Sequence, residues 1–291
     1  MTPWLALGAA LLALAVFAAC WWGSNIVFFP PRMLPNSVYP EQFGLAYEKV
    51  SFSSADGVTL RGWIIPAAVP TDTAIMLCHG WGDNKGDLLR RFHFLAERHN
   101  LFLFDSRHHG ESDGAISSIG CLEARDFNAA LAWFKANHPL WTRRLGLLGL
   151  SMGAAMAIRG LAEHGGFRCA LAEAPFRSFN RVMHQFCSNA YRLPYYPFVW
   201  LTLIIVRWRV GEDSEPYSPI YNAPKMPAIP LFFIAGEKDQ LMPLGEVRAV
   251  YDACAQPKEL WVVPEGTHGR NQETAGREYA ERVTQFFAKN L

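Results

Sequence analysis

The chain has 291 residues, of which 51% are hydrophobic and 18% are charged. This composition supports one large folded domain or two smaller ones, and it excludes an intrinsically disordered chain. The 27 basic and 26 acidic residues nearly cancel, and no Lys/Arg cluster offers a phosphate backbone a binding surface, so we expect no nucleic-acid partner.

In the first segment, from Pro3 to Phe29, the only strongly polar side chain is Asn25, and the segment is long enough to cross a bilayer as a helix. Most signal peptides open with Lys or Arg, and no such residue precedes this segment. We therefore predict an uncleaved, single-pass transmembrane anchor over residues 1–30. The alternatives are a cleaved signal peptide, a lipoprotein cleavage site at Cys20, and a buried amphipathic helix. The lack of a polar face argues against the last of these.

Two observations predict the side of the membrane. Arg32 closely follows the apolar segment, and the positive-inside tendency therefore favours a cytoplasmic catalytic domain. The cysteines show neither a C-x-x-C motif nor a Cys/His ligand spacing, so we expect free and mostly buried thiols, as in a reducing compartment. They are Cys20, Cys78, Cys121, Cys169, Cys187 and Cys254.

A linker is predicted over residues 31–48, followed by one domain over residues 49–291. In this domain short apolar runs alternate with helical patterns, which is typical of a mostly parallel sheet of about eight strands flanked by helices. Asp56-Gly57 predicts a hairpin turn, so the sheet should open with an antiparallel pair. The predicted strands are 48–54, 60–67, 74–80, 101–107, 145–151, 169–176, 230–236 and 259–266. The predicted helices are 87–98, 122–137, 152–164, 245–253 and 279–289.

The alternation is interrupted at residues 177–216, where a single crossover helix would suffice. This stretch contains "YYPFVWLTLIIVRWRVG", an apolar run that is short for a second membrane span. We predict an inserted helical cap over a functional site. The alternative is a long hydrophobic crossover helix packed on the sheet.

Ser151 lies in Gly149-Leu150-Ser151-Met152-Gly153, a G-x-S-x-G pattern between an apolar strand and an alanine-rich helix. Such a turn holds a nucleophilic serine in a strained conformation, and the flanking glycines relieve crowding. A glycine-rich bend that serves packing alone is the alternative. The strand-to-helix context favours the nucleophile.

A serine hydroxyl needs a base, and the base needs an orienting acid. Asp239 and His268 follow the last two predicted strands, at the carboxyl edge where parallel-sheet sites form. The chain order Ser, Asp, His is the one expected for this architecture. The backbone N–H groups of Met152 and Trp81 are the predicted oxyanion donors. His79, which is beside this donor turn, is interpreted as structural rather than as an alternative base.

The segments "LCHGWGDNKGD", "LFLFDSRHHGESDG", "LGLLGLSMGAA", "IAGEKDQLMP" and "PEGTHG" together resemble the α/β-hydrolase superfamily, nearest to its BEM46-like, membrane-anchored serine hydrolases. The resemblance covers residues 50–289. It implies that Ser151 is the nucleophile, Asp239 the acid and His268 the base, with Trp81 and Met152 as oxyanion donors. It also implies architectural roles for Asp105, Arg107, Gly110 and Ser112. His109 and "GTHGR" depart from the commoner family pattern and weaken any assignment to a subfamily.

The predicted function is hydrolysis of a carboxylic ester or thioester through an acyl-enzyme, with no metal or organic cofactor. The expected partners are a small-molecule or lipid-like acyl ester substrate and a membrane; no oligomeric state follows from the sequence. Acyl transfer, peptide cleavage and a non-catalytic binding module are the alternatives. Serine at the turn argues against dehalogenase and epoxide hydrolase chemistry, which use Asp there.

Overall fold

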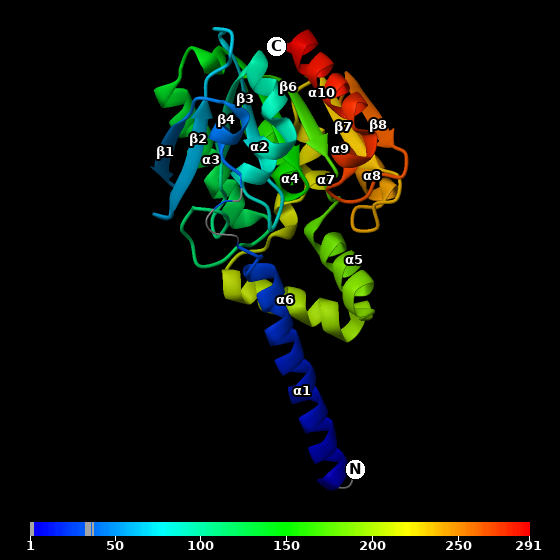
Figure 1. The fold of residues 1–291 in the computed structure, drawn as a ribbon. Coiled ribbons are helices and arrows are strands. Elements are labelled where there is room, and N and C mark those ends of the chain that lie inside the picture. Colours follow the sequence, from blue (N-terminus) through cyan, green and yellow to red (C-terminus); the bar gives the residue numbers. More distant parts are fainter. Residues whose placement is uncertain (1–2, 33–35, 37) are drawn as a thin grey trace.

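The centre of the molecule is an eight-stranded sheet (Figure 1). The computed structural model describes residues 3–32, 36 and 38–291. The predicted strands are all present in it. They are β1 (Glu48–Ser53), β2 (Thr59–Ile65), β3 (Thr73–Cys78), β4 (Asn100–Phe104), β5 (Arg144–Leu150), β6 (Phe167–Glu173), β7 (Leu231–Gly236) and β8 (Lys258–Val263).

The strand order is β1-β2-β4-β3-β5-β6-β7-β8. β2 is antiparallel to both of its neighbours, and the remaining pairs are parallel. The predicted hairpin after β1 is therefore confirmed, with Ser53 opposite Thr59. Because β3 to β8 run in one direction, their carboxyl ends meet at one edge of the sheet.

Helices cover both faces of the sheet, and the residues of β3 alternate between the two cores. Met76 packs in the core formed with α3, α4 and α8, whereas Ile75 and Leu77 pack in the core formed with α2 and α10. The helices are α1 (Pro3–Phe28), α2 (Lys85–Phe92), α3 (Cys121–Asn137), α4 (Met152–Glu163), α5 (Phe179–Tyr191), α6 (Trp200–Val210), α7 (Pro219–Asn222), α8 (Leu244–Ala253), α9 (Asn271–Ala275) and α10 (Arg277–Asn290).

The predicted helices agree with the observed ones to within two residues at each end, except for the first of them. The sequence predicted a helix over 87–98, but α2 begins at Lys85 because the Asn84 side chain accepts hydrogen bonds from the amides of Gly86 and Asp87. The chain then tightens into a 3₁₀ helix over His93–Glu97. Other short turns are η1 (Pro40–Phe43), η3 (Trp141–Arg143), the π-helical η4 (Tyr195–Val199), η5 (Glu215–Tyr217) and η6 (Ala223–Lys225).

α1 projects away from the domain, and α5 and α6 lie beside its inner end, off the sheet (Figure 1). The most apolar part of α1 has a mean hydropathy of 2.2, and only 6% of it is buried. By length and composition this helix could cross a membrane, although a signal sequence meets the same criteria. Its last turns are different, because Cys20, Ser24, Val27 and Phe28 are buried against the domain.

All six cysteines are free thiols, and only Cys187 is partly exposed. The prediction of unpaired, mostly buried cysteines is therefore confirmed. Burial raises the pKa of Cys169 and Cys254 to about 12, so these two thiols stay protonated and unreactive at neutral pH.

Candidate active site

Ser151 occupies the single-residue turn between β5 and α4. Its backbone has φ 54° and ψ −113°, a conformation that side chains other than glycine rarely adopt. The turn also brings α4 against the neighbouring strands. A Cβ at Gly149 would lie 2.3 Å from the Gly153 oxygen, and a Cβ at Gly153 would lie 2.0 Å from the Cys78 oxygen. Both glycines are therefore required by close backbone approach.

Three predicted site residues meet at the carboxyl edge of the sheet. His268 Nε2 lies 3.1 Å from Ser151 Oγ, and His268 Nδ1 lies 2.8 Å from Asp239 Oδ2. Asp239 follows β7 and His268 follows β8, so the parallel strand direction brings residues distant in sequence to one place. A hydroxyl, an imidazole and a carboxylate thus form one hydrogen-bonded chain, an arrangement that can activate the hydroxyl as a nucleophile.

The Asp239 carboxylate is buried and is held in position by backbone amides on the side away from His268. Its Oδ1 accepts hydrogen bonds from the backbone amides of Leu241 and Met242, at 2.9 and 2.8 Å. Only Oδ2 faces the imidazole. Because a carboxylate accepts hydrogen bonds, Nδ1 of His268 carries the proton and Nε2 presents its lone pair to Ser151.

The two residues predicted as oxyanion donors, Trp81 and Met152, lie beside Ser151. Met152 is the first residue of α4, where an amide has no intrahelical partner. Trp81 follows β3, and Trp81 and Met152 both line the pocket that contains Ser151. Neither amide donates a hydrogen bond to an acceptor in residues 3–32, 36 or 38–291. Both N–H groups are therefore available to a developing oxyanion.

His79 is not available as a second base. It is fully buried, its Nε2 accepts a hydrogen bond from the Ser106 amide at 2.9 Å, and its Nδ1 donates to the Gly80 oxygen at 2.7 Å. Both ring nitrogens are therefore occupied. This geometry agrees with the structural role predicted for His79.

The turn after β4 carries the residues for which the family resemblance implied architectural roles. Asp105 accepts from the Lys85 amide at 2.7 Å and forms an ion pair with the Lys85 ammonium group, where neither side chain is exposed. Ser112 Oγ donates to the Asp105 main-chain oxygen at 2.6 Å. A Cβ at Gly110 would lie 2.3 Å from the Asp105 carboxylate. These contacts hold the turn in place.

Arg107 holds the same turn to the rest of the domain. Its guanidinium pairs with the buried Asp126 at 2.7 Å and with Asp56 at 2.7 Å. Burial alone would lower the pKa of Arg107, but hydrogen bonds to Asp126 and Asp56 and the charge of Asp126 raise it above the ordinary value. A buried arginine with two such partners is a structural anchor, and removing Arg107 would leave the buried Asp126 carboxylate without its partner.

Glu173 was not predicted from the sequence. It ends β6, and its main-chain oxygen accepts from the Ser151 amide at 2.8 Å. Its fully buried carboxyl group accepts from Asn271 Nδ2 at 2.8 Å and from the Tyr279 hydroxyl. Burial raises the pKa of Glu173. The position could have been found from the acidic residue that ends the apolar run "CALAEAP", because a charge there needs a partner.

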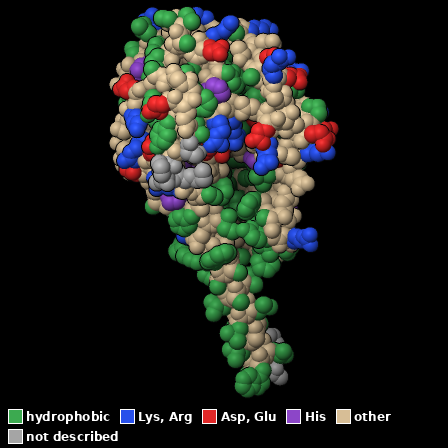
Figure 2. All heavy atoms as spheres, in the orientation of Figure 1, with side chains coloured by type: hydrophobic (Ala, Val, Ile, Leu, Met, Phe, Trp, Pro, Cys, Tyr) green, Lys and Arg blue, Asp and Glu red, His purple; other side chains and the backbone are tan. Residues whose placement is uncertain are grey.

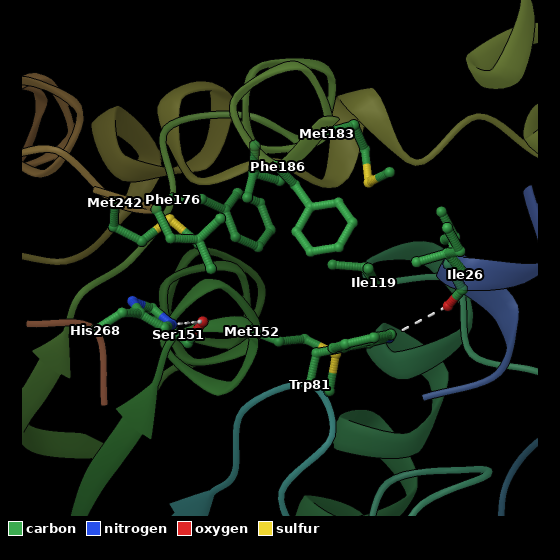
Figure 3. Close-up of a pocket in the computed structure, with 13 residues that line it drawn as sticks. Ile26, Trp81, Ile119, Ser151, Met152, Phe176, Met183, Phe186, Met242 and His268 are labelled. Carbon is green, nitrogen blue, oxygen red and sulfur yellow. Dashed lines mark hydrogen bonds between the residues drawn. The ribbon is translucent and has the colours of Figure 1, made fainter. Parts of the chain in front are cut away.

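An apolar pocket adjoins Ser151 and His268, with about 640 Å³ of open space including its mouth. Figure 3 shows these two residues at one end and Ile26 at the other, with Met183 and Phe186 above. The lining residues are Ile26, Val27, Trp81, Ile119, Ser151, Met152, Phe176, Val182, Met183, Phe186, Leu241, Met242 and His268. α5 therefore contributes one wall, and α1 contributes another that the sequence did not predict.

Comparisons with known proteins show which families and structures the chain resembles. A model of the prolyl oligopeptidase family matches residues 116–291, which include Ser151, Asp239 and His268. The uncharacterized protein YqkD of Bacillus subtilis is 28% identical over 244 residues, covering 82% of this chain and 79% of YqkD. Protein bem46 of Schizosaccharomyces pombe is 26% identical over 271 residues, covering 90% of this chain and 83% of bem46. Among solved structures, the esterase Pf2001 of Pyrococcus furiosus has a TM-score of 0.74 and 26% identity, covering 90% of this chain and 98% of that one.

Proposed function

The chain belongs to the prolyl oligopeptidase family within the α/β-hydrolase superfamily, near BEM46-like proteins, and from this premise we propose that it is a serine hydrolase of carboxylic esters or thioesters. The observation that carries the proposal is the hydrogen-bonded chain from Ser151 Oγ through His268 to Asp239, at 3.1 and 2.8 Å. The fold alone would not identify the reaction.

In the first half of the reaction, Ser151 Oγ attacks the carbonyl carbon of the substrate while His268 Nε2 takes the hydroxyl proton. The imidazolium that forms is stabilised by Asp239, whose carboxylate already accepts the Nδ1 proton at 2.8 Å. The backbone N–H groups of Trp81 and Met152 stabilise the oxyanion. His268 then gives its proton to the departing alcohol or thiol, and an acyl group remains on Ser151.

In the second half, a water molecule attacks the acyl carbon and loses a proton to His268 Nε2. The tetrahedral intermediate meets the same two N–H donors. Its collapse breaks the bond to Ser151 Oγ, which recovers its proton from His268, and the carboxylic acid leaves. The residues that meet the substrate in these steps, Ser151, His268, Trp81 and Met152, line the pocket, and Asp239 acts through His268.

The pocket favours an acyl chain as the group that is bound. Apart from Ser151 and His268 its lining is apolar or aromatic, so it offers few hydrogen bonds to a peptide backbone. The structural likeness to an esterase points the same way. Each methylene buried in such a pocket adds about 0.8 kcal/mol at most, and we expect medium or long acyl chains to be preferred over acetyl.

Peptide cleavage is the second candidate, and the name of the matched family favours it. Acyl transfer to an acceptor other than water would use the same residues. A non-catalytic module is a further alternative, although such modules commonly lose a member of the serine, histidine and acid set. A panel of p-nitrophenyl esters of graded length, a thioester and a peptide amide would separate the enzymatic candidates.

The decisive experiment for the proposed nucleophile is covalent labelling with a fluorophosphonate probe. The full chain should be labelled and should hydrolyse esters, whereas Ser151→Ala should lose both properties, with activity falling by a factor on the order of 10⁶. Circular dichroism should be unchanged. Labelling of the Ser151→Ala variant at another serine would contradict the assignment.

For location we propose that α1 is an uncleaved anchor, because Ile26 and Val27 are part of the pocket wall, and that the hydrolase domain is cytoplasmic. Six free thiols suit a reducing compartment. A protease added to intact cells should leave the domain uncut and should digest it after lysis. Digestion without lysis would reverse the topology.

A further inference from the structure

One face of α6 exposes large apolar side chains. Trp200, Ile204 and Trp208 are 44%, 45% and 72% exposed, and their spacing of four residues places them in one row along the helix. On the surface of a soluble protein, large apolar side chains are usually isolated from one another. A contiguous row of them marks a surface that contacts another protein, a ligand or a membrane.

The other face of α6 is already occupied. Ile205 and Val206 are buried, and Val206 packs in a small core with Val27 and Phe28 of α1 and with Met183 of α5. α6 is therefore held firmly against α1 and α5, and the exposed row cannot turn inward without losing that core.

The row continues onto neighbouring segments as a band of aromatic rings. Trp208 lies 5.7 Å from Trp21 of α1, ring centre to ring centre, and Trp200 lies 6.1 Å from Tyr196. Trp21 in turn lies 6.1 Å from Phe17. We call these residues with Ile204 the aromatic band: Phe17, Trp21, Tyr196, Trp200, Ile204 and Trp208. Figure 2 shows hydrophobic side chains gathered over α1 and the adjoining base of the domain, and charged ones mostly above.

The polar groups beside the band suit a membrane–water boundary. Arg207 is exposed next to Trp208 and pairs with Asp213 at 3.2 Å. Arg209 donates to Asn25 Oδ1 at 2.8 Å and lies over the Phe28 ring at 4.4 Å, which satisfies the polar side chain near the end of α1. Tryptophan with arginine along one short helix is typical of segments that lie at a bilayer surface.

The length of α1 also places the aromatic band at the membrane–water boundary. A helix needs about 20 residues to cross the hydrocarbon core. The first 20 residues of α1 run from Pro3 to Trp22, and Trp22 is 69% exposed. Trp21 and the α6 row that it contacts are therefore at the depth of the headgroups when the exposed part of α1 spans the bilayer.

Two residues contact both the helix that carries the aromatic band and the pocket. Val27 and Met183 belong both to the core that seats α6 and to the pocket lining. At the end of the pocket away from Ser151 (Figure 3) lies Ile26, which is near the inner end of α1, the proposed membrane anchor.

From these observations we propose that the aromatic band rests on the lipid bilayer and that the pocket takes its acyl substrate, a long-chain lipid ester, from that bilayer. Contact of the aromatic band with lipid is inferred from the exposed side chains alone, and uptake of substrate from the bilayer rests on the proposed hydrolase function. The occupant is lipid rather than a second copy of the chain, because the band is continuous with an apolar helix of membrane-spanning length.

Contact with lipid is tested by tryptophan quenching in the full-length protein, reconstituted in phosphatidylcholine vesicles with brominated acyl chains. The Trp200→Phe/Trp208→Phe variant should lose part of the quenched fluorescence. Trp141→Phe is the control, since Trp141 precedes β5 at the opposite edge of the sheet, and it should lose only unquenched fluorescence. Unchanged quenching in the double variant would overturn the proposal, as would a band-dependent dimer that shields both tryptophans.

Delivery of substrate from the bilayer is tested with the variant Trp200→Ser/Ile204→Ser/Trp208→Ser. Leu140→Ser is the control, because Leu140 is 60% exposed and precedes β5, at the edge of the sheet opposite Ser151. Hydrolysis of a long-chain ester embedded in vesicles should fall at least tenfold, while a soluble butyrate ester and fluorophosphonate labelling should stay within twofold. An equal loss on both substrates, or no loss, would overturn it. If the wild-type protein is neither labelled nor active, the proposed function fails, and the quenching result still decides lipid contact.

Discussion

The indole Nε1 of Trp81 donates a hydrogen bond to the main-chain oxygen of Val27 at 3.2 Å. The bond ties the loop after β3, which supplies a proposed oxyanion donor, to the last turn of the apolar helix α1. The helix is thus part of the site and not only an attachment to it. Such a hydrogen bond usually contributes about 1 kcal/mol net to the free energy of folding.

Trp81→Phe should loosen this loop while retaining the aromatic wall of the pocket. We expect kcat to fall about fivefold, which corresponds to about 1 kcal/mol, because the Trp81 amide is less well positioned when the oxyanion forms. KM should change little. Steady-state kinetics on a soluble ester measure both constants, with Trp141→Phe as the control, and an unchanged kcat would show that the bond has no role in turnover.

Asp239→Asn should disable the base without disturbing the fold. The Leu241 and Met242 amides require an acceptor at the Oδ1 position, so the new NH₂ group must face His268. It would donate to Nδ1 and leave the proton on Nε2, which could then not accept from Ser151. We expect kcat to fall by about 10⁴. A rate near that of the wild type would place the orienting acid elsewhere.

Ser151→Gly should be more stable than Ser151→Ala, although both should be inactive. At φ 54° and ψ −113°, alanine retains the backbone strain that serine carries, and glycine relieves it by about 1 kcal/mol. The glycine variant should therefore melt about 2–4 °C higher. Thermal denaturation in the same detergent compares the two proteins, and equal melting temperatures would mean that the turn is unstrained.

Gly153→Ala should strongly destabilise the protein, because the new Cβ would lie 2.0 Å from the Cys78 oxygen, a backbone atom that cannot move alone. Gly245→Ala is the matched control: Gly245 also lies near the start of a helix, but no atom lies within 4 Å of its Cβ position. Alanine there should be neutral or stabilising by about 0.5 kcal/mol. The yield of folded protein and its melting temperature distinguish them, and equal behaviour would contradict the close packing of α4.

Stability should fall as the pH drops below about 6.5. Burial, followed by repulsion from His79, lowers the pKa of His109 to about 3, so His109 is neutral when folded and takes up a proton on unfolding. Its contribution is complete above the unfolded pKa and is lost as the pH falls from there toward 3, by at most about 1.4 kcal/mol per pH unit.

His109→Gln should therefore reduce the difference in melting temperature between pH 7.5 and pH 5.5. His184→Gln is the control because His184 is exposed, and it should behave like the wild type. If all three proteins lose the same stability on acidification, another group controls the acid sensitivity.

Much of the fold followed from local patterns in the sequence. Apolar runs of strand length, punctuated by glycine and proline, predicted the eight strands, and the Asp56-Gly57 turn predicted the hairpin. The positions of Ser151, Asp239 and His268 could be predicted together because parallel strands align their carboxyl ends, so each residue that follows a strand has a known edge. The turn chemistry at Gly149 and Gly153 is likewise local.

Only the tertiary structure decided what the apolar segments contact. Burial of apolar surface is non-directional, so the composition of α1 and α6 does not specify a partner. The structure brings Val27 to Trp81, Trp21 to Trp208, and α5 over Ser151. Glu173 is a similar case, since its partners Asn271 and Tyr279 lie far along the chain. Such contacts depend on how the helices pack around a completed sheet, a property of the whole chain rather than of any one segment.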